Sequence, residues 1–211
     1  MPETRRLLEA ASALSHALRA QGVPHAFHGS LFVAVLANSP QADVRPLRRS
    51  SSDGTVFCDL IAAQEIFCIV EGGTVHPFRR VRQALTGNAE LSITPSPWSN
   101  RLHVKYHHCI PPIEIEILAA GESGPRRLDA LTVAIVSRVP FLTTSEFVRA
   151  KLNAWMIRGS ERDAQDIVFI MSRYWNSIDI NRIPEHDMDR FVEMVGAAAP
   201  GWAAIKRKYG M

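Results

Sequence analysis

The sequence predicts an α+β fold, in which a strand-containing half over residues 1–140 is followed by a helical half over residues 141–211. Three observations predict this division. Glycine turns separate extended apolar segments from helical ones in the first hundred residues. Apolar and polar residues alternate between residues 101 and 118, as in half-buried strands. From Thr143 onward, helix-capping sequences replace the strand patterns.

The composition is that of a folded chain. Of its 211 residues, 46% are hydrophobic and 21% are charged, which is typical of globular rather than disordered proteins. The formal net charge is only +3, and Lys and Arg are spread along the chain. This charge pattern disfavours a nucleic-acid partner without excluding one, and it only weakly favours an anionic ligand. The expected partner is a small-molecule or nucleotide ligand.

The cysteines and the N-terminal sequence indicate a cytoplasmic protein. Cys58, Cys68 and Cys109 lie in apolar or strand-like surroundings and lack the spacing of a metal site or a disulfide framework. The N-terminal segment has an amphipathic helical pattern rather than a signal-peptide core. No apolar run approaches the roughly 20 residues that span a bilayer, so we expect no membrane association.

The first elements form a strand, a glycine turn and a helix. A helix is predicted over about residues 4–20. A short extended segment at His25 to His28 follows, and Gly29 and Ser30 then open a buried helix.

Three more strands are predicted in the first half, over residues 65–70, 101–109 and 113–118. A helix is expected to begin near Pro77, after the first of these. Residues 38–58 are rich in turn-forming and basic residues, so we expect a surface loop that could overhang the site.

The remaining elements are mainly helical. Residues 125–140 are interpreted as a short β-α element whose apolar part runs from Leu131 to Val136. Capping sequences predict an antiparallel pair of helices over 143–158 and 160–175. A third helix is expected over 184–196, followed by a short basic tail.

Several of these features together resemble the minimal and AbiEii-type nucleotidyltransferases. The pieces are the Gly29-Ser30 turn after a strand, acidic positions on two later strands, and the spacing Lys151-x-x-Ala154-x-x-x-Arg158-x-x-x-x-Asp163-x-x-Asp166. The stretch around His76-Pro77 is also similar to fungal members. The resemblance spans about residues 5–175, and the order and spacing of the pieces carry it. It implies a mixed sheet with flanking helices, and a helical half that completes the cleft.

The resemblance also implies a chemistry. In that superfamily the Gly-Ser turn holds a triphosphate, and strand carboxylates hold Mg²⁺ through hard oxygen ligands. Carried over, Gly29 and Ser30 would bind phosphate, and Glu65 and Glu116 would bind the metal and act in catalysis, with Glu114 as the less favoured alternative to Glu116. Mg²⁺ is the expected cofactor if nucleotidyl transfer is retained, and no cofactor is expected otherwise.

Phe67 departs from the superfamily pattern. Where the family has an acidic, a hydrophobic and an acidic residue, this chain has Glu65-Ile66-Phe67. A phenyl ring cannot ligate a metal, so the loss of an anionic ligand is expected to weaken Mg²⁺ binding. Asp53 or Asp59 could substitute from the loop, although neither has the matching neighbours.

Other residues complete the candidate site. Lys151 and Arg158 lie seven apart, or about two helical turns, so they share a face on which a phosphate could sit. His28, beside the glycine turn, is predicted to stand at the mouth of the cleft and to titrate near neutral pH, as a catalytic acid or base. The residues expected to line the substrate cleft are Phe67, His103, Glu114 and Asp163.

Each candidate also has a purely structural interpretation. In the first half, Ser30 would cap the following helix, Glu65 would be a charge at a strand edge, and Glu114 and Glu116 would face solvent. In the second half, Lys151 and Arg158 would lie on a solvated helix face. Asp163 would complement the dipole of its helix, and Asp166 would pair with Arg162.

Three functions are compatible with these residues. The first is transfer of a nucleoside monophosphate from a nucleoside triphosphate to a hydroxyl acceptor, which is favoured only by the precedent of the fold. The second is binding of a small organic molecule in a phenylalanine-lined cleft, with a metal-free isomerisation or cyclisation. The third is a non-catalytic binding module, which a closed cleft with Phe67 packed in the core would favour.

Overall fold

The computed structural model describes residues 2–38, 66–94, 101–122 and 124–211. The predicted loop over residues 38–58, apart from its first residue, therefore lies outside the described part. So do the candidate ligands Asp53, Asp59 and Glu65.

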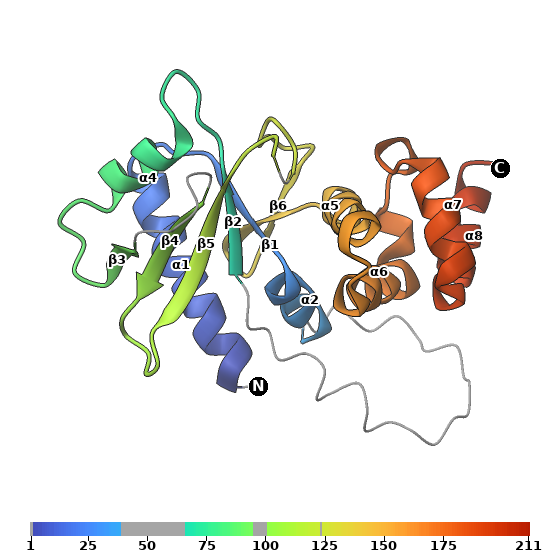
Figure 1. Cartoon of the computed structure of the whole chain (residues 1–211), viewed down its shortest axis with the longest axis horizontal. Coiled ribbons are helices and arrows are strands. Elements are labelled where there is room, and N and C mark those ends of the chain that lie inside the picture. The colour runs from blue at the N-terminus through green and yellow to red at the C-terminus, as the bar shows by residue number, and fades with distance from the viewer. Residues whose placement is uncertain (1, 39–65, 95–100, 123) are drawn as a thin grey trace.

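The described residues form a mixed, seven-stranded sheet (Figure 1). Its strands are β1 (His25–His28), β2 (Ile66–Val70), β3 (Leu91–Thr94), β4 (Leu102–Tyr106), β5 (Ile113–Ala119), β6 (Val133–Val136) and β7 (Val139–Leu142). Their order across the sheet is β3-β4-β5-β2-β1-β7-β6. The pairs β2–β5 and β1–β7 are parallel and the others are antiparallel, so the prediction of a mixed sheet is confirmed.

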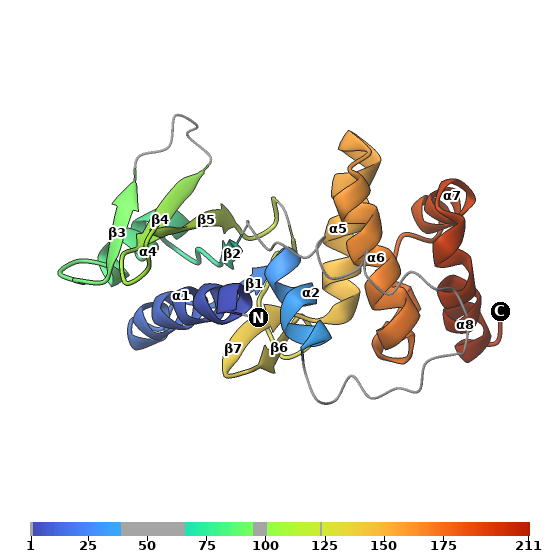
Figure 2. The ribbon, with the colours of Figure 1, turned by 90° about the horizontal axis from the view of Figure 1, so that it is seen from below.

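The helices form two groups. Those of the first half are α1 (Pro2–Ala20), α2 (Ser30–Ala37) and α4 (Pro77–Ala84). Those of the second half are α5 (Thr144–Arg158), α6 (Glu161–Tyr174), α7 (Glu185–Met194) and α8 (Ala199–Lys208). Helices α1 and α4 contact each other and β5 and cover one face of the sheet. Figure 2 shows α5 to α8 gathered at one end of the sheet, as the α+β prediction requires. No helix within the described residues is long and apolar enough to cross a membrane.

One hydrophobic core cluster runs through both halves of the described protein. In α1 its members include Leu7, Leu14 and Leu18, which recur at helical spacing. In β4 the buried residues alternate with half-buried polar ones, as the sequence pattern predicts.

Two predictions outside the main elements are wrong, and one strand was not predicted. Residues 125–140 contain no helix; they lead into a β-hairpin of β6 and β7. The expected basic tail is instead helix α8, because Trp202 and Ile205 are buried and hold that segment against the body of the protein. Strand β3, which pairs with β4, has too short a pattern to be recognised in the sequence.

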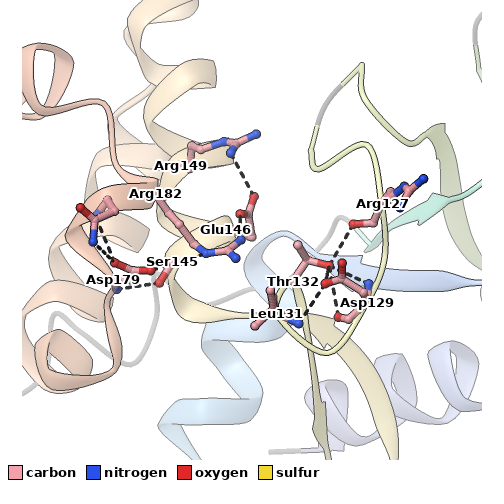
Figure 3. A network of polar contacts seen from close by, with 10 residues as sticks. Arg127, Asp129, Leu131, Thr132, Ser145, Glu146, Arg149, Asp179 and Arg182 are labelled. Atoms are coloured by element: carbon pink, nitrogen blue, oxygen red, sulfur yellow. Dashed lines mark hydrogen bonds and ion pairs between the residues drawn. The ribbon is translucent and has the colours of Figure 1, made fainter.

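The expected capping box at the start of α5 does not form either. Thr143 makes no side-chain cap, and the Glu146 side chain, only 1% exposed, turns inward to accept a hydrogen bond from Arg182 at 2.7 Å. Figure 3 shows this contact beside a second polar network, in which the Thr132 hydroxyl donates to the Arg127 carbonyl at 2.9 Å. Thr143 N donates to Thr132 O, and this backbone bond links the start of α5 to the segment that leads into the hairpin.

Substitutions in the turn between β6 and β7 should stabilise the protein. Ser137 and Arg138 connect β6 to β7 with φ values of 49° and 67°, which is the left-handed geometry of a type I′ turn that favours Asn-Gly. A non-glycine residue pays an energetic penalty there. We expect Ser137→Asn with Arg138→Gly to raise the free energy of unfolding by about 1 kcal/mol, measured by urea denaturation. Arg138→Lys is the matched control, and an equal gain from it would contradict the explanation.

Candidate functional site

A row of four residues crosses the sheet on the face opposite α1. The His25 imidazole contacts the Ser15 hydroxyl of α1, so His28, three residues further along β1, points to the other face. In the strand register, His28 is opposite Phe67, Phe67 is opposite Glu116, and Glu116 is opposite His103. Paired residues of neighbouring strands project from the same face of a sheet.

A cleft of about 400 Å³ lies between this row and α5. The sheet contributes His28, Phe67, Glu116 and Leu118, and α5 contributes Ala150, Lys151, Asn153, Ala154, Ile157 and Arg158, with Arg101 and Glu122 completing the lining. The strand and helix elements thus bring His28, Phe67, Glu116, Lys151 and Arg158 together, as expected for one site.

Other predicted residues lie outside the lining of this cleft. His103 and Glu114 contact each other through Nδ1 and Oε1, and Lys105 lies 3.9 Å from the same carboxylate. Asp163 lies behind the cleft rather than in its lining. Glu116, in contrast, faces the cleft, and its carboxylate lies 2.7 Å from Arg101 Nη1.

The His28 side chain is buried and neutral. Neither ring nitrogen has a hydrogen-bond partner among the described residues. Burial, followed by the positive charge of Lys151, lowers the pKa of His28 to about 3, against the opposing effect of Asp163. The expectations that His28 stands at the mouth of the cleft and titrates near neutral pH are therefore wrong, because the side chain is buried in the wall of the cleft beside Phe67. The two rings are 5.2 Å apart between centroids and inclined by 30°.

Lys151 and Arg158 are both paired with carboxylates. Lys151 Nζ lies 2.8 Å from Asp163 Oδ1 and 2.7 Å from Asp166 Oδ2. Arg158 places Nε and Nη2 each at 2.9 Å from Asp163 Oδ2. The Lys151 side chain is 9% exposed and that of Asp163 is 3% exposed. On the face predicted to be solvated or to bind phosphate, Lys151 is thus buried in an ion-pair cluster with Asp163 and Asp166, whereas the Arg158 side chain is 59% exposed.

The glycine turn has the predicted form, but Ser30 does not cap the helix. Gly29 is the capping residue, with a φ of 94° that favours glycine. Ser30 is the first residue of α2, is buried, and donates a long hydrogen bond of 3.5 Å to Asp166 Oδ2. The turn is therefore linked to the ion-pair cluster.

The described residues do not fit a Mg²⁺ site. Mg²⁺ requires near-octahedral oxygen coordination, usually from one or two carboxylates and water. Phe67 is opposite Glu116 in the strand register, and the Glu116 carboxylate is already paired with Arg101. Within the described residues, no group of three His, Cys, Asp or Glu side chains could hold a metal ion.

The sequence did not reveal several residues that line the cleft. Leu118 is two residues after Glu116 on the same strand, so strand alternation alone could have placed it there. Ala150, Ala154 and Ile157 follow helical spacing on α5. Arg101 had no signal in the sequence, because its role depends on the pairing of β4 with β5.

Two solved structures have a similar fold. An antigenic nucleotidyltransferase-like protein from Paracoccidioides brasiliensis superposes with a TM-score of 0.57 and 13% identity, over 95% of this chain and 92% of that one. The protein JHP933 from Helicobacter pylori gives a TM-score of 0.53 and 11% identity, over 97% of this chain and 81% of that one. No family model and no curated protein matches the sequence. The chain has a nucleotidyltransferase-like fold, and likeness at these identities extends to the fold alone.

Proposed function

We propose that this chain, with its nucleotidyltransferase-like fold, binds a small organic molecule in the cleft between the sheet and α5, without a divalent cation. The observation that supports this most is the position of Phe67. Its half-buried ring lines the cleft at the strand position opposite Glu116. An apolar ring therefore stands where the resemblance implies a second metal ligand.

The charges around the cleft also favour a ligand of low charge. Three cations line it, Arg101, Lys151 and Arg158, but each is paired with a carboxylate. A nucleoside triphosphate carries several negative charges, and its binding would require these pairs to break or a metal ion to compensate. A neutral or singly charged organic molecule requires neither.

His28 is assigned to binding rather than to proton transfer. A pKa of about 3 makes the imidazole a weak base at neutral pH, whereas an efficient general base has a pKa near the working pH. A neutral imidazole still offers one hydrogen-bond donor and one acceptor. The open cleft beside it favours ligand binding over a vestigial, closed site.

Nucleotidyl transfer is the second candidate function. It is supported by the fold and by the Gly29 turn, since backbone N–H groups at the start of α2 are suited to anionic oxygens. In that case Glu65, which lies outside the described residues, would have to join Glu116 in holding Mg²⁺.

A thermal-shift screen distinguishes the two functions. The melting temperature of the protein is measured with each member of a metabolite collection and with the four nucleoside triphosphates, once in a buffer with EDTA and once in a buffer with Mg²⁺. The proposal expects organic ligands that raise the melting temperature equally in both buffers. Ala154→Trp, which fills the cleft from α5, should abolish these shifts, whereas Ile135→Trp on the exposed strand β6 should not. Shifts only with nucleotides and only in Mg²⁺ would reject the proposal and favour nucleotidyl transfer.

Restoring a carboxylate should create metal binding. Phe67→Asp would place an anionic oxygen pair across neighbouring strands, because residue 67 is opposite Glu116. We expect its affinity for Mn²⁺, used as a Mg²⁺ substitute, to exceed that of the wild type by about tenfold or more, measured by calorimetric titration. The control is Ile157→Asp, a carboxylate at the exposed rim. Equal Mn²⁺ affinities for wild type and Phe67→Asp would show that Phe67 is not what prevents metal binding.

A further inference from the structure

The His28 imidazole is a buried polar group without a partner. Both ring nitrogens are buried, and neither has a hydrogen bond among the described residues. His25, on the same strand, shows the usual arrangement: its Nδ1 donates to the Val23 carbonyl at 2.8 Å and its Nε2 accepts from the Ser15 hydroxyl at 2.9 Å. Unpaired buried polar groups are costly and uncommon, so the contrast within one strand points to a partner that binds at His28.

Phe67 and the His28 imidazole both line the cleft. Their rings pack against each other at 5.2 Å between centroids, and Phe67 is half-buried whereas His28 is 8% exposed. A ligand in the cleft can therefore contact the Phe67 ring and also reach the unpartnered imidazole nitrogens.

The opposite wall of the cleft is α5, which contributes an apolar stripe beside Lys151, Asn153 and Arg158. Ala150, Ala154 and Ile157 are four and three residues apart, so they lie along one helix face, and all three line the cleft. The two alanines leave room between the helix and the sheet. Ile157 is 86% exposed, which extends the stripe to the rim.

We propose that the cleft binds a flat aromatic ring with an N–H group on its edge. The ring enters between Phe67 and the α5 stripe, and its N–H donates to the unprotonated nitrogen of the His28 imidazole, while Phe67 packs against the ring. This inference rests on the proposed function and specifies the chemical class of its ligand.

Indole and indene are suitable probes, because they have nearly the same shape and only indole carries an N–H group. We expect the full chain to bind indole about tenfold more tightly than indene, as measured by chemical-shift titration. The side-chain nitrogen resonances of His28 should shift with indole and not with indene. His28→Leu should remove the difference between the probes, whereas His107→Leu, the same replacement at an exposed histidine, should preserve it.

Equal affinities for the two probes, or unchanged His28 nitrogen resonances in the wild type, would overturn the inference. The chemical shifts of the His28 nitrogens are measured on the wild-type protein, so they test the inference even if His28→Leu fails to fold. If neither ring binds but the metabolite screen still finds cleft ligands that Ala154→Trp excludes, the ring inference is wrong and the proposed function stands. If no cleft ligand of any kind is found, both are wrong.

Discussion

Replacing Lys151 with methionine is expected to lower the free energy of unfolding by about 3–5 kcal/mol. The ammonium group of Lys151 is the shared partner of Asp163 and Asp166, at 2.8 and 2.7 Å. Methionine fills a similar volume but leaves the Asp166 carboxylate, which is 10% exposed, without its cation. An unpaired buried charge is far more costly than the loss of a surface ion pair. Urea denaturation followed by circular dichroism measures the change.

Two further variants test the cause. Lys105→Met removes an exposed lysine that lies 3.9 Å from Glu114, and it should cost less than about 1 kcal/mol. Lys151→Met combined with Asp166→Asn removes the unpaired charge and should recover part of the lost stability. If the double variant is no more stable than Lys151→Met alone, an unpaired carboxylate is not the reason for the loss.

The ion-pair cluster has a direct consequence for the cleft. Lys151 is on α5, Asp163 and Asp166 are on α6, and Ser30 at the start of α2 donates to Asp166. The cluster thus links α2, α5 and α6, of which α5 lines the cleft. A lysine held by two carboxylates is a poor phosphate ligand, which is why its main contribution is to position α5 opposite the sheet.

Most of the fold could be predicted because the conformation of many turns and strands is marked by residues within the same short segment. The Gly29 turn was recognisable because its conformation favours glycine, and β4 because its buried residues alternate. The hairpin at Ser137-Arg138 was missed for the converse reason: its left-handed turn contains neither of the residues that usually mark one.

The candidate site was less predictable because it depends on contacts between distant segments. The sequence placed Lys151 and Arg158 on one helix face, but only the antiparallel packing of α5 on α6 shows that Asp163 neutralises both. Phe67 was recognised as a departure from the family pattern. That its ring packs against a buried imidazole follows from the pairing of β1 with β2, which no local pattern reveals.

Acidification should destabilise the protein steeply, because two buried histidines resist protonation in the folded state. Burial is the main cause for both: it lowers the pKa of His28 to about 3 and that of His25 to about 4, from 6.5. Below pH 6.5 the unfolded chain binds protons that the folded chain does not, so stability falls as the pH falls. Each histidine contributes about 1.4 kcal/mol per pH unit, or together about 5 kcal/mol between pH 7.5 and 4.5.

The charged groups that face these histidines modify the dependence of the unfolding free energy on pH without reversing its direction. Lys151 lowers and Asp163 raises the pKa of His28, and Arg19 lowers that of His25. The raised pKa of Asp166, due mainly to burial, acts in the opposite direction, since its protonation favours the folded state.

Urea denaturation at half-unit steps of pH tests this prediction, with His28→Leu and the exposed-site control His16→Leu. His28→Leu should remove about half of the loss of stability between pH 7.5 and 4.5, because only His25 then remains to take up a proton on unfolding. His16→Leu should leave the slope as in the wild type. If His28→Leu leaves the wild-type dependence of stability on pH unchanged, His28 takes up its proton in the folded protein as readily as in the unfolded chain, and its burial does not lower its pKa.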